Sequence, residues 1–95
     1  MAISQEDKAI IKMTSAGDAI TGHAFVLSLY WVSKSAIAGD DLLVSDEDGD
    51  TIWEAVADGT NFSQVFPVLR RIKGLTLTTR DSGTLYVVQR ATPNL

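Results

Sequence analysis

The nine residues AFVLSLYWV (24–32) constrain the fold of this chain more than any other stretch. Side chains along a β-strand alternate between two faces, so one face of this stretch is expected to carry Phe25, Leu27, Leu29 and Trp31. The residues between them are largely apolar as well, which is typical of a strand that is covered on both sides. The stretch therefore predicts a central strand, with one face on a core and the other against a loop or a partner.

Further runs of strand-forming residues follow at short intervals along the chain. They are rich in β-branched and aromatic residues, and turn signals such as Asp48-Gly49 and Ser82-Gly83 separate them. Pro67 restricts its own short run to a sheet edge or a bulge, because proline cannot donate to a neighbouring strand. The predicted strands besides 24–32 are residues 8–14, 41–46, 51–57, 65–68, 74–79 and 84–90.

The lack of crossover helices decides the fold class. Residues 4–13 fit a helix or a strand equally well, and residues 59–65 are too short and too polar to form a useful helix. Parallel strands need crossover connections, which are usually helices. The sequence therefore predicts an all-β fold, a small antiparallel β-sandwich or partly open barrel of about six to eight short strands. A single domain is expected over residues 1–95, with residues 1–7 as a candidate N-terminal arm and residues 91–95 as a loose C-terminal tail.

Composition excludes several classes of function. The net charge is −4 and the only basic doublet is Arg70-Arg71, which argues against a nucleic-acid partner. Cysteine is absent, so disulfide scaffolds, thiol catalysis and cysteine-based zinc sites are excluded. The N-terminal residues lack the pattern of a signal peptide, and no apolar run approaches the roughly 18 residues of a membrane span. We expect synthesis in the cytoplasm and no membrane partner.

The acidic stretch VSDEDGDTIW (44–53) raises the question of a metal site or of paired catalytic acids. With Gly49 at the glycine position of an EF-hand loop, Val44 and Ala55 fall where that loop needs oxygen ligands, so an EF-hand is rejected. An acid/base pair needs two different environments, whereas neighbours on one turn share the same solvent. The favoured interpretation is a solvated hairpin turn. A looser Ca²⁺ site stays open, with candidate ligands Asp46, Asp48 and Asp50.

His23 is the only histidine and would have to serve any Ser-His-Asp arrangement. No Gly-x-Ser-x-Gly motif or glycine-rich oxyanion loop accompanies it. A lone histidine at the start of a strand is more often a structural hydrogen-bonding residue. We therefore predict no enzymatic activity, no catalytic residues and no cofactor.

Apolar residues on both faces of one strand indicate a protein partner. A domain of this size can leave one such face uncovered, and large exposed apolar patches mark partner surfaces. The aromatic residues do not alternate with basic ones, so stacking on nucleic acid is not expected. The Arg70-Arg71 doublet has two interpretations, protection of a sheet edge or contact with an acidic partner. The interface candidates are Val26, Tyr30, Trp31, Trp53, Phe66, Arg70 and Arg71.

Three segments within residues 22–89 resemble small proteins encoded among the virion structural genes of tailed bacteriophages. The segments are AFVLSLYWVSKSAIAGDDLLVSDEDGDTIWEAVADG, then VFPV, then GLTLTTRDSGTLYVV. The resemblance implies a β-sandwich accessory protein located in the virion, such as a capsid decoration (cement) protein. It also implies a homo-oligomer, with a trimer favoured, that docks on the major capsid protein or a neighbouring virion protein. Residues 1–7 would then be a candidate docking arm.

A second class of function stays open beside this one. A β-sandwich module on the virion could bind carbohydrate or a host surface, with Ca²⁺ at the acidic turn. Its mechanism would be the stacking of exposed Trp31 or Trp53 on sugar rings.

Overall fold

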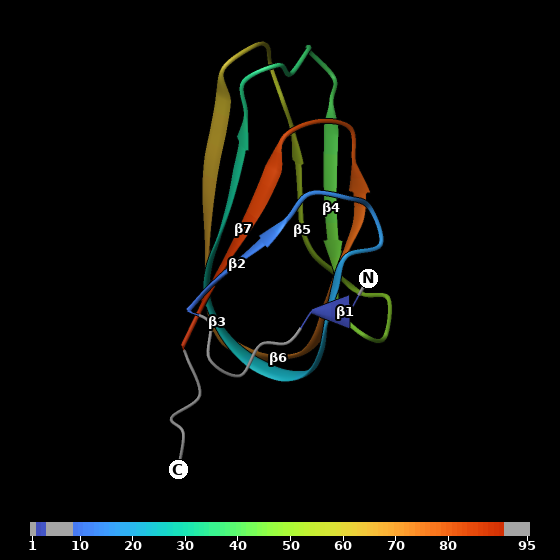
Figure 1. Cartoon of the computed structure of the whole chain (residues 1–95), viewed down its shortest axis with the longest axis vertical. Helices are drawn as coiled ribbons and strands as arrows, with labels where there is room; N and C mark the ends of the chain where they lie inside the picture. Colours follow the sequence, from blue (N-terminus) through green and yellow to red (C-terminus); the bar gives the residue numbers. More distant parts are fainter. Residues whose placement is uncertain (1, 4–8, 91–95) are drawn as a thin grey trace.

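Seven β-strands make up most of this protein, whose computed structural model describes residues 2–3 and 9–90 (Figure 1). They form one hydrogen-bonded sheet in the order β2-β7-β3-β6-β4-β5, with β1 added beside β3. Every neighbouring pair is antiparallel except β1 and β3, and the described residues contain no helix, so the all-β prediction is confirmed. The strands are β1 (Ala2–Ile3), β2 (Ile10–Met13), β3 (Ala19–Ser33), β4 (Asp41–Ser45), β5 (Thr51–Val56), β6 (Phe62–Arg80) and β7 (Thr84–Gln89).

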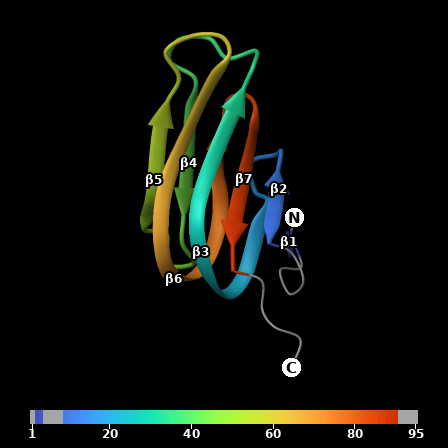
Figure 2. The same cartoon turned by 90° about the vertical axis from the view of Figure 1, so that its left-hand side faces the viewer.

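The sheet folds back on itself because its two longest strands, β3 and β6, bend together at one end of the molecule (Figures 1 and 2). Residues 26–33 of β3 and 62–67 of β6 lie with β2 and β7 in what we call the β7 layer. Residues 19–25 of β3 and 70–80 of β6 lie with β4 and β5 in the β4 layer. The result is an open β-sandwich built from a single folded sheet, in agreement with the predicted fold class.

One irregularity in pairing lies at the β4-layer side of the bend. Ile20 pairs with Leu75 and His23 pairs with Lys73, so two residues of β3 lie opposite the single residue Gly74. Such a bulge bends the strand and increases its local twist. Gly74 has φ of 72°, a backbone conformation that glycine adopts without steric cost.

A second irregularity lies on the β7-layer side. Val26 pairs with Arg70 and Ser28 pairs with Pro67, so β6 carries one residue more than β3 between these pairs. Leu69 is one of these residues and has φ of 52°, which is uncommon for a residue other than glycine. Pro67 lies beside the bulge, as its chemistry predicts.

These irregularities correct two expectations about the strands. Residues 65–68 and 74–79 are not separate short strands, because β6 continues through both bends. The expected alternation of residues 24–32 fails at Leu27, which the bulge leaves without a paired residue on β6 or β7. As a result Val26 is buried, like Leu29 and Trp31, instead of lying on the opposite face.

The structure describes only part of the predicted N-terminal arm, candidate helix and C-terminal tail. Of the candidate helix over residues 4–13, residues 10–13 form β2, which settles that part as strand. Of the arm over residues 1–7, only the backbone of Ala2–Ile3 is described, paired with β3 as β1. The remainder of the arm and the tail over residues 91–95 lie outside the described residues.

The core lies between the two layers, and aromatic rings close its open side. Trp53 of β5 stacks on Phe66 of β6 with a centroid distance of 5.4 Å and an interplanar angle of 6°. In the described part of the chain β5 pairs only with β4, so this stack joins two elements that share no backbone hydrogen bonds. Trp31 packs on Phe62 at 5.1 Å. Other core residues include Met13, Leu29, Leu42, Val44, Leu75, Leu77, Leu85 and Val87.

Candidate functional site

The outer face of the β7 layer carries a row of apolar side chains that crosses four strands. Lys12 of β2 pairs with Tyr86 of β7, Tyr86 pairs with Tyr30 of β3, and Tyr30 pairs with Val65 of β6. Directly opposed residues of antiparallel strands lie on the same face of a sheet. The two tyrosine rings contact each other, with centroids 6.1 Å apart.

A second row lies beside the first. Ile10 pairs with Val88, Val88 pairs with Ser28, and Ser28 pairs with Pro67. Ile10 and Val65 are each 58% exposed, and Tyr30 is 36% exposed. We call the two rows together the tyrosine face; its members are Ile10, Lys12, Ser28, Tyr30, Val65, Pro67, Tyr86 and Val88.

The side chains of the tyrosine face are not those that fill the core of the chain. The core of the β7 layer is supplied by the alternate residues of the same strands, such as Leu85 and Val87 on β7. The strands therefore do not need Ile10, Tyr30 or Val65 to fill the core. Lys12 is the only charged member of the face, and an exposed apolar surface of this kind is typical of a protein interface.

Only one of the predicted aromatic interface candidates lies on this face. Tyr30 is at its centre, whereas Phe66 is half-buried against Trp53. Val26 and Trp31 are 0% exposed and Trp53 is 7% exposed, so these three side chains cannot contact a partner. Their assignment to an interface is corrected, and so is the expectation that an exposed tryptophan stacks on sugar. They are buried because β3 and β5 both point them between the layers.

Several members of the tyrosine face were not predicted. The sequence indicated that one strand was apolar on both faces, but not which residues of other strands lie beside it. That information depends on register, which places Ile10, Val65, Tyr86 and Val88 around Tyr30. The alternation of β7, in which Thr84, Tyr86 and Val88 are half-buried, was the available signal.

The basic doublet lies at the bend of β6, apart from the tyrosine face. Arg70 and Arg71 are both exposed there, next to the bulge that contains Leu69. Arg71 pairs with Phe25 of β3, and the guanidinium carbon of Arg90 lies 4.5 Å from the centre of the Phe25 ring. Arg71 therefore belongs to a larger basic surface.

The acidic stretch forms a compact turn between β4 and β5. One carboxylate oxygen of Asp46, Oδ1, accepts hydrogen bonds from the backbone N–H groups of Asp48 and Asp50, at 3.0 and 2.9 Å. The carboxylate of Asp46, one of the three candidate calcium ligands, thus stabilises the turn through hydrogen bonds to its backbone. Within the described residues no three His, Cys, Asp or Glu side chains are arranged to hold a metal ion. The geometry fits the interpretation as a solvated hairpin turn.

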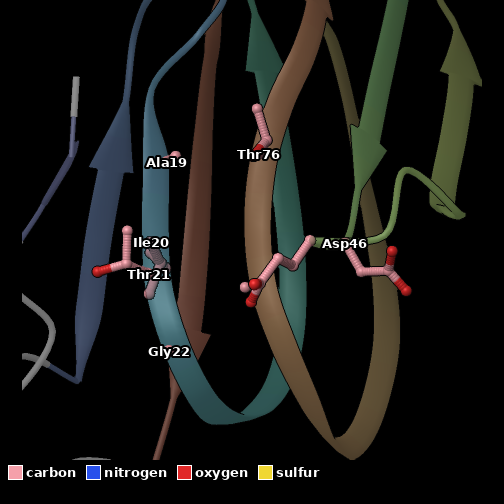
Figure 3. Close-up of a pocket in the computed structure, with 8 residues that line it drawn as sticks. Ala19, Ile20, Thr21, Gly22, Asp46 and Thr76 are labelled. Atoms are coloured by element: carbon pink, nitrogen blue, oxygen red, sulfur yellow. The ribbon is translucent and has the colours of Figure 1, made fainter.

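A pocket of about 550 Å³ lies beside this turn, over the β4 layer (Figure 3). β3 and β6 supply small residues to its lining, and Asp46 and Glu47 border it. None of the lining residues is a histidine, lysine or cysteine. Its lining residues are Ala19, Ile20, Thr21, Gly22, Asp46, Glu47, Gly74 and Thr76.

A serine–carboxylate cluster lies near the start of β4, away from His23. Ser82 Oγ donates to Asp40 Oδ2 at 2.7 Å and lies 2.7 Å from Ser33 Oγ. The same carboxylate accepts from the backbone N–H of Ile37 at 3.1 Å. His23 lies instead at the bend of β3, paired with Lys73, so the structure assembles no Ser-His-Asp arrangement from these residues. The cluster holds the β6–β7 turn against the loop that precedes β4.

Comparison with known proteins adds a fold likeness and no family. No model of a known protein family matches the chain, and no curated protein matches it in sequence. A crystal structure of a cupin domain from Bordetella pertussis Tohama I matches in structure, with 10% sequence identity and a TM-score of 0.38. The match covers 93% of this chain and 100% of that one. A likeness this distant carries no argument about function. Nor does the described part of the chain contain a helix long and apolar enough to cross a membrane.

Proposed function

We propose that this protein is a structural subunit without enzymatic activity, which works by protein–protein contact through the tyrosine face. The observation that carries the proposal is the in-register row Lys12–Tyr86–Tyr30–Val65 on an outward surface. Such a row combines two rigid aromatic rings with flanking aliphatic residues and a single charge. Aromatic residues are enriched and charged ones depleted at the centres of protein interfaces.

The proposed setting is the particle of a tailed bacteriophage, where the subunit decorates and stabilises the capsid. Support comes from the resemblance of residues 22–89 to small virion proteins and from an open sandwich with one uncovered apolar face. The proposed partner of the tyrosine face is the major capsid protein or a neighbouring virion protein. Contact with a second copy of the chain uses a different surface, described below.

A carbohydrate-binding module is the weaker alternative. The tryptophans that would stack on sugar are buried, which removes the mechanism first considered. Sugar sites also need placed polar groups. On the tyrosine face these are limited to Ser28, Lys12 and the two tyrosine hydroxyls, and exposed aliphatic side chains such as Ile10 and Val65 surround them.

The experiment compares Val65→Lys with Val56→Lys for binding to purified capsids of the phage that encodes the chain. The two valines are 58% and 57% exposed, but Val56 lies on β5 in the other layer. We expect cosedimentation with capsids to fall at least about tenfold for Val65→Lys, because a charge would be buried in the contact, and to stay unchanged for Val56→Lys. Equal binding by both variants, or no binding by the unaltered protein, would reject the proposal.

A further inference from the structure

Basic side chains gather on one outward surface where β3 and β6 bend. Phe25 pairs with Arg71 and His23 pairs with Lys73, so these four residues share one face of the two-stranded ribbon. The guanidinium carbon of Arg90 lies 4.5 Å above the Phe25 ring from the other side of β3. Arg71, Lys73 and Arg90 are all exposed. We call these three residues around Phe25 the cationic bend.

The cationic bend has no carboxylate partner in residues 9–90, the continuous part of the chain that the structure describes. No ion pair is formed there by Arg71, Lys73 or Arg90. These three exposed cations form no ion pair within residues 9–90, in a chain whose net charge is −4. The surface is therefore complementary to a cluster of carboxylates.

The turn between β4 and β5 lies near the same end of the molecule (Figure 1) and carries such a cluster. The turn between β4 and β5 exposes Glu47, Asp48 and Asp50, while Asp46 holds its shape from within. The backbone N–H of Glu47 donates to the carbonyl oxygen of Lys73 at 2.9 Å, which fixes the turn beside the bend. Thus three exposed carboxylates and three exposed cations adjoin without forming ion pairs within residues 9–90.

We propose that the cationic bend of one copy binds the acidic turn, Glu47, Asp48 and Asp50, of a second copy of this chain. Charge-assisted bonds between guanidinium groups and carboxylates are among the stronger polar contacts, and Arg71 and Arg90 can supply two of them. A long polyanion such as nucleic acid is a poorer occupant, because it brings no cation to the acidic turn that lies beside the bend, whereas the bend of a second copy does. The inference goes beyond the proposed function, since it uses neither the tyrosine face nor a virion partner.

The geometry of this contact also restricts the kind of assembly. The bend and the turn adjoin on one surface, so the bend of each copy can bind the turn of the other at the same time, which is an isologous contact. An isologous contact closes as a dimer with twofold symmetry. Both surfaces lie at the same end of the molecule, so the twofold axis of the dimer would pass near that end.

The test is a set of charge reversals read by size-exclusion chromatography with light scattering at low ionic strength. Arg71→Glu with Lys73→Glu reverses the bend, Asp48→Lys with Asp50→Lys reverses the turn, and a fourfold variant reverses both. We expect an oligomer for the unaltered protein, a monomer for each double variant, and restoration of the oligomer in the fourfold variant. Raised salt should dissociate the native oligomer, because exposed charges are screened within about 10 Å at 0.1 M.

Control variants distinguish loss of the contact from loss of folding and from a general effect of changed net charge. Lys34→Glu and Asp58→Lys make like changes of sign at other exposed positions and should leave the mass unchanged. Arg71→Gln with Lys73→Gln removes charge more mildly, and far-ultraviolet circular dichroism confirms that each variant folds.

Four results would overturn the proposal. They are a monomeric unaltered protein, an oligomer that survives either double reversal, a fourfold variant that stays monomeric, and a bend that captures a single-stranded oligonucleotide instead. The capsid-binding comparison of Val65→Lys and Val56→Lys is independent of all four, so either proposal can fail alone.

Discussion

The indole nitrogen of Trp31 donates a hydrogen bond to the carbonyl oxygen of Ser82, 2.9 Å away. The bond joins the C-terminal end of β3 to the β6–β7 turn across 51 residues of sequence. Trp31 is 0% exposed, and a buried tryptophan needs a partner for its one polar hydrogen. The bond therefore explains how the largest side chain of β3 can lie in the core.

Replacing Trp31 by Phe should lower the free energy of unfolding by about 2–4 kcal/mol, because it removes the donor and leaves a gap. The matched change Trp53→Phe keeps a ring to stack on Phe66 and should cost about half as much. Urea denaturation followed by circular dichroism gives both values. Equal losses for the two variants would show that the bond to Ser82 contributes little.

Gly83→Ala should destabilise the protein by at least about 3 kcal/mol, and the chain should fold poorly if at all. A Cβ atom there would lie against the carbonyl oxygen of Val32 and 2.5 Å from the Cβ of Ser33, and φ is 80°. Gly39 has φ of 96° but open space around it, so Gly39→Ala should cost only about 1 kcal/mol. Thermal denaturation separates the two effects, since similar melting temperatures would contradict the close approach at Gly83.

Leu69→Gly should leave stability unchanged or raise it by up to about 1 kcal/mol. Leu69 has φ of 52° and is 66% exposed, so glycine relieves backbone strain at little loss of burial. Leu69→Ile keeps the apolar character but adds a branch at Cβ, and should destabilise by about 1 kcal/mol or more. Chemical denaturation of both variants tests the left-handed conformation, and a less stable glycine variant would speak against it.

Asp46→Ala should destabilise by about 1–2 kcal/mol, because two backbone N–H groups lose their acceptor. Asp46→Asn keeps an oxygen acceptor in place, so its loss of stability should be less than half of that of Asp46→Ala. Asp48→Ala should leave stability nearly unchanged. If a calcium site with a millimolar dissociation constant existed, calcium at about 100 times that concentration would raise the free energy of unfolding by roughly 2.7 kcal/mol. We expect calcium to leave the melting temperature unchanged. A rise in melting temperature with calcium that is lost in Asp48→Ala would instead show that the turn binds the metal.

Local chemistry was enough to predict most strands and turns. The runs 41–46, 51–57 and 84–90 became β4, β5 and β7 within a residue or two, because their alternation matches a half-buried strand. Gly49 and Gly83 lie in turns with positive φ, as the hairpin signals predicted.

The bends and the site depended on features that have no local signature. A bulge changes the phase of alternation by one residue, so the alternation predicted for residues 24–32 placed Leu29 and Trp31 on one face correctly but put Val26 on the wrong face. The left-handed conformation of Leu69 is imposed by the tertiary fold, since nothing in leucine favours it. The cationic bend likewise required pairing between β3 and β6 and the return of Arg90 to Phe25.

The shared strands β3 and β6 determine how cooperatively this protein unfolds. Each runs through both layers, so the two layers share two continuous strands. Most two-sheet sandwiches have layers joined mainly through side chains, whereas here the backbone itself makes the connection. Native-state amide hydrogen exchange should therefore find the slowest protons of both layers opening together, as one cooperative unit with a single free energy. The chain also has to bring residues near 20 and 75 together early, so its folding should be slow for its size.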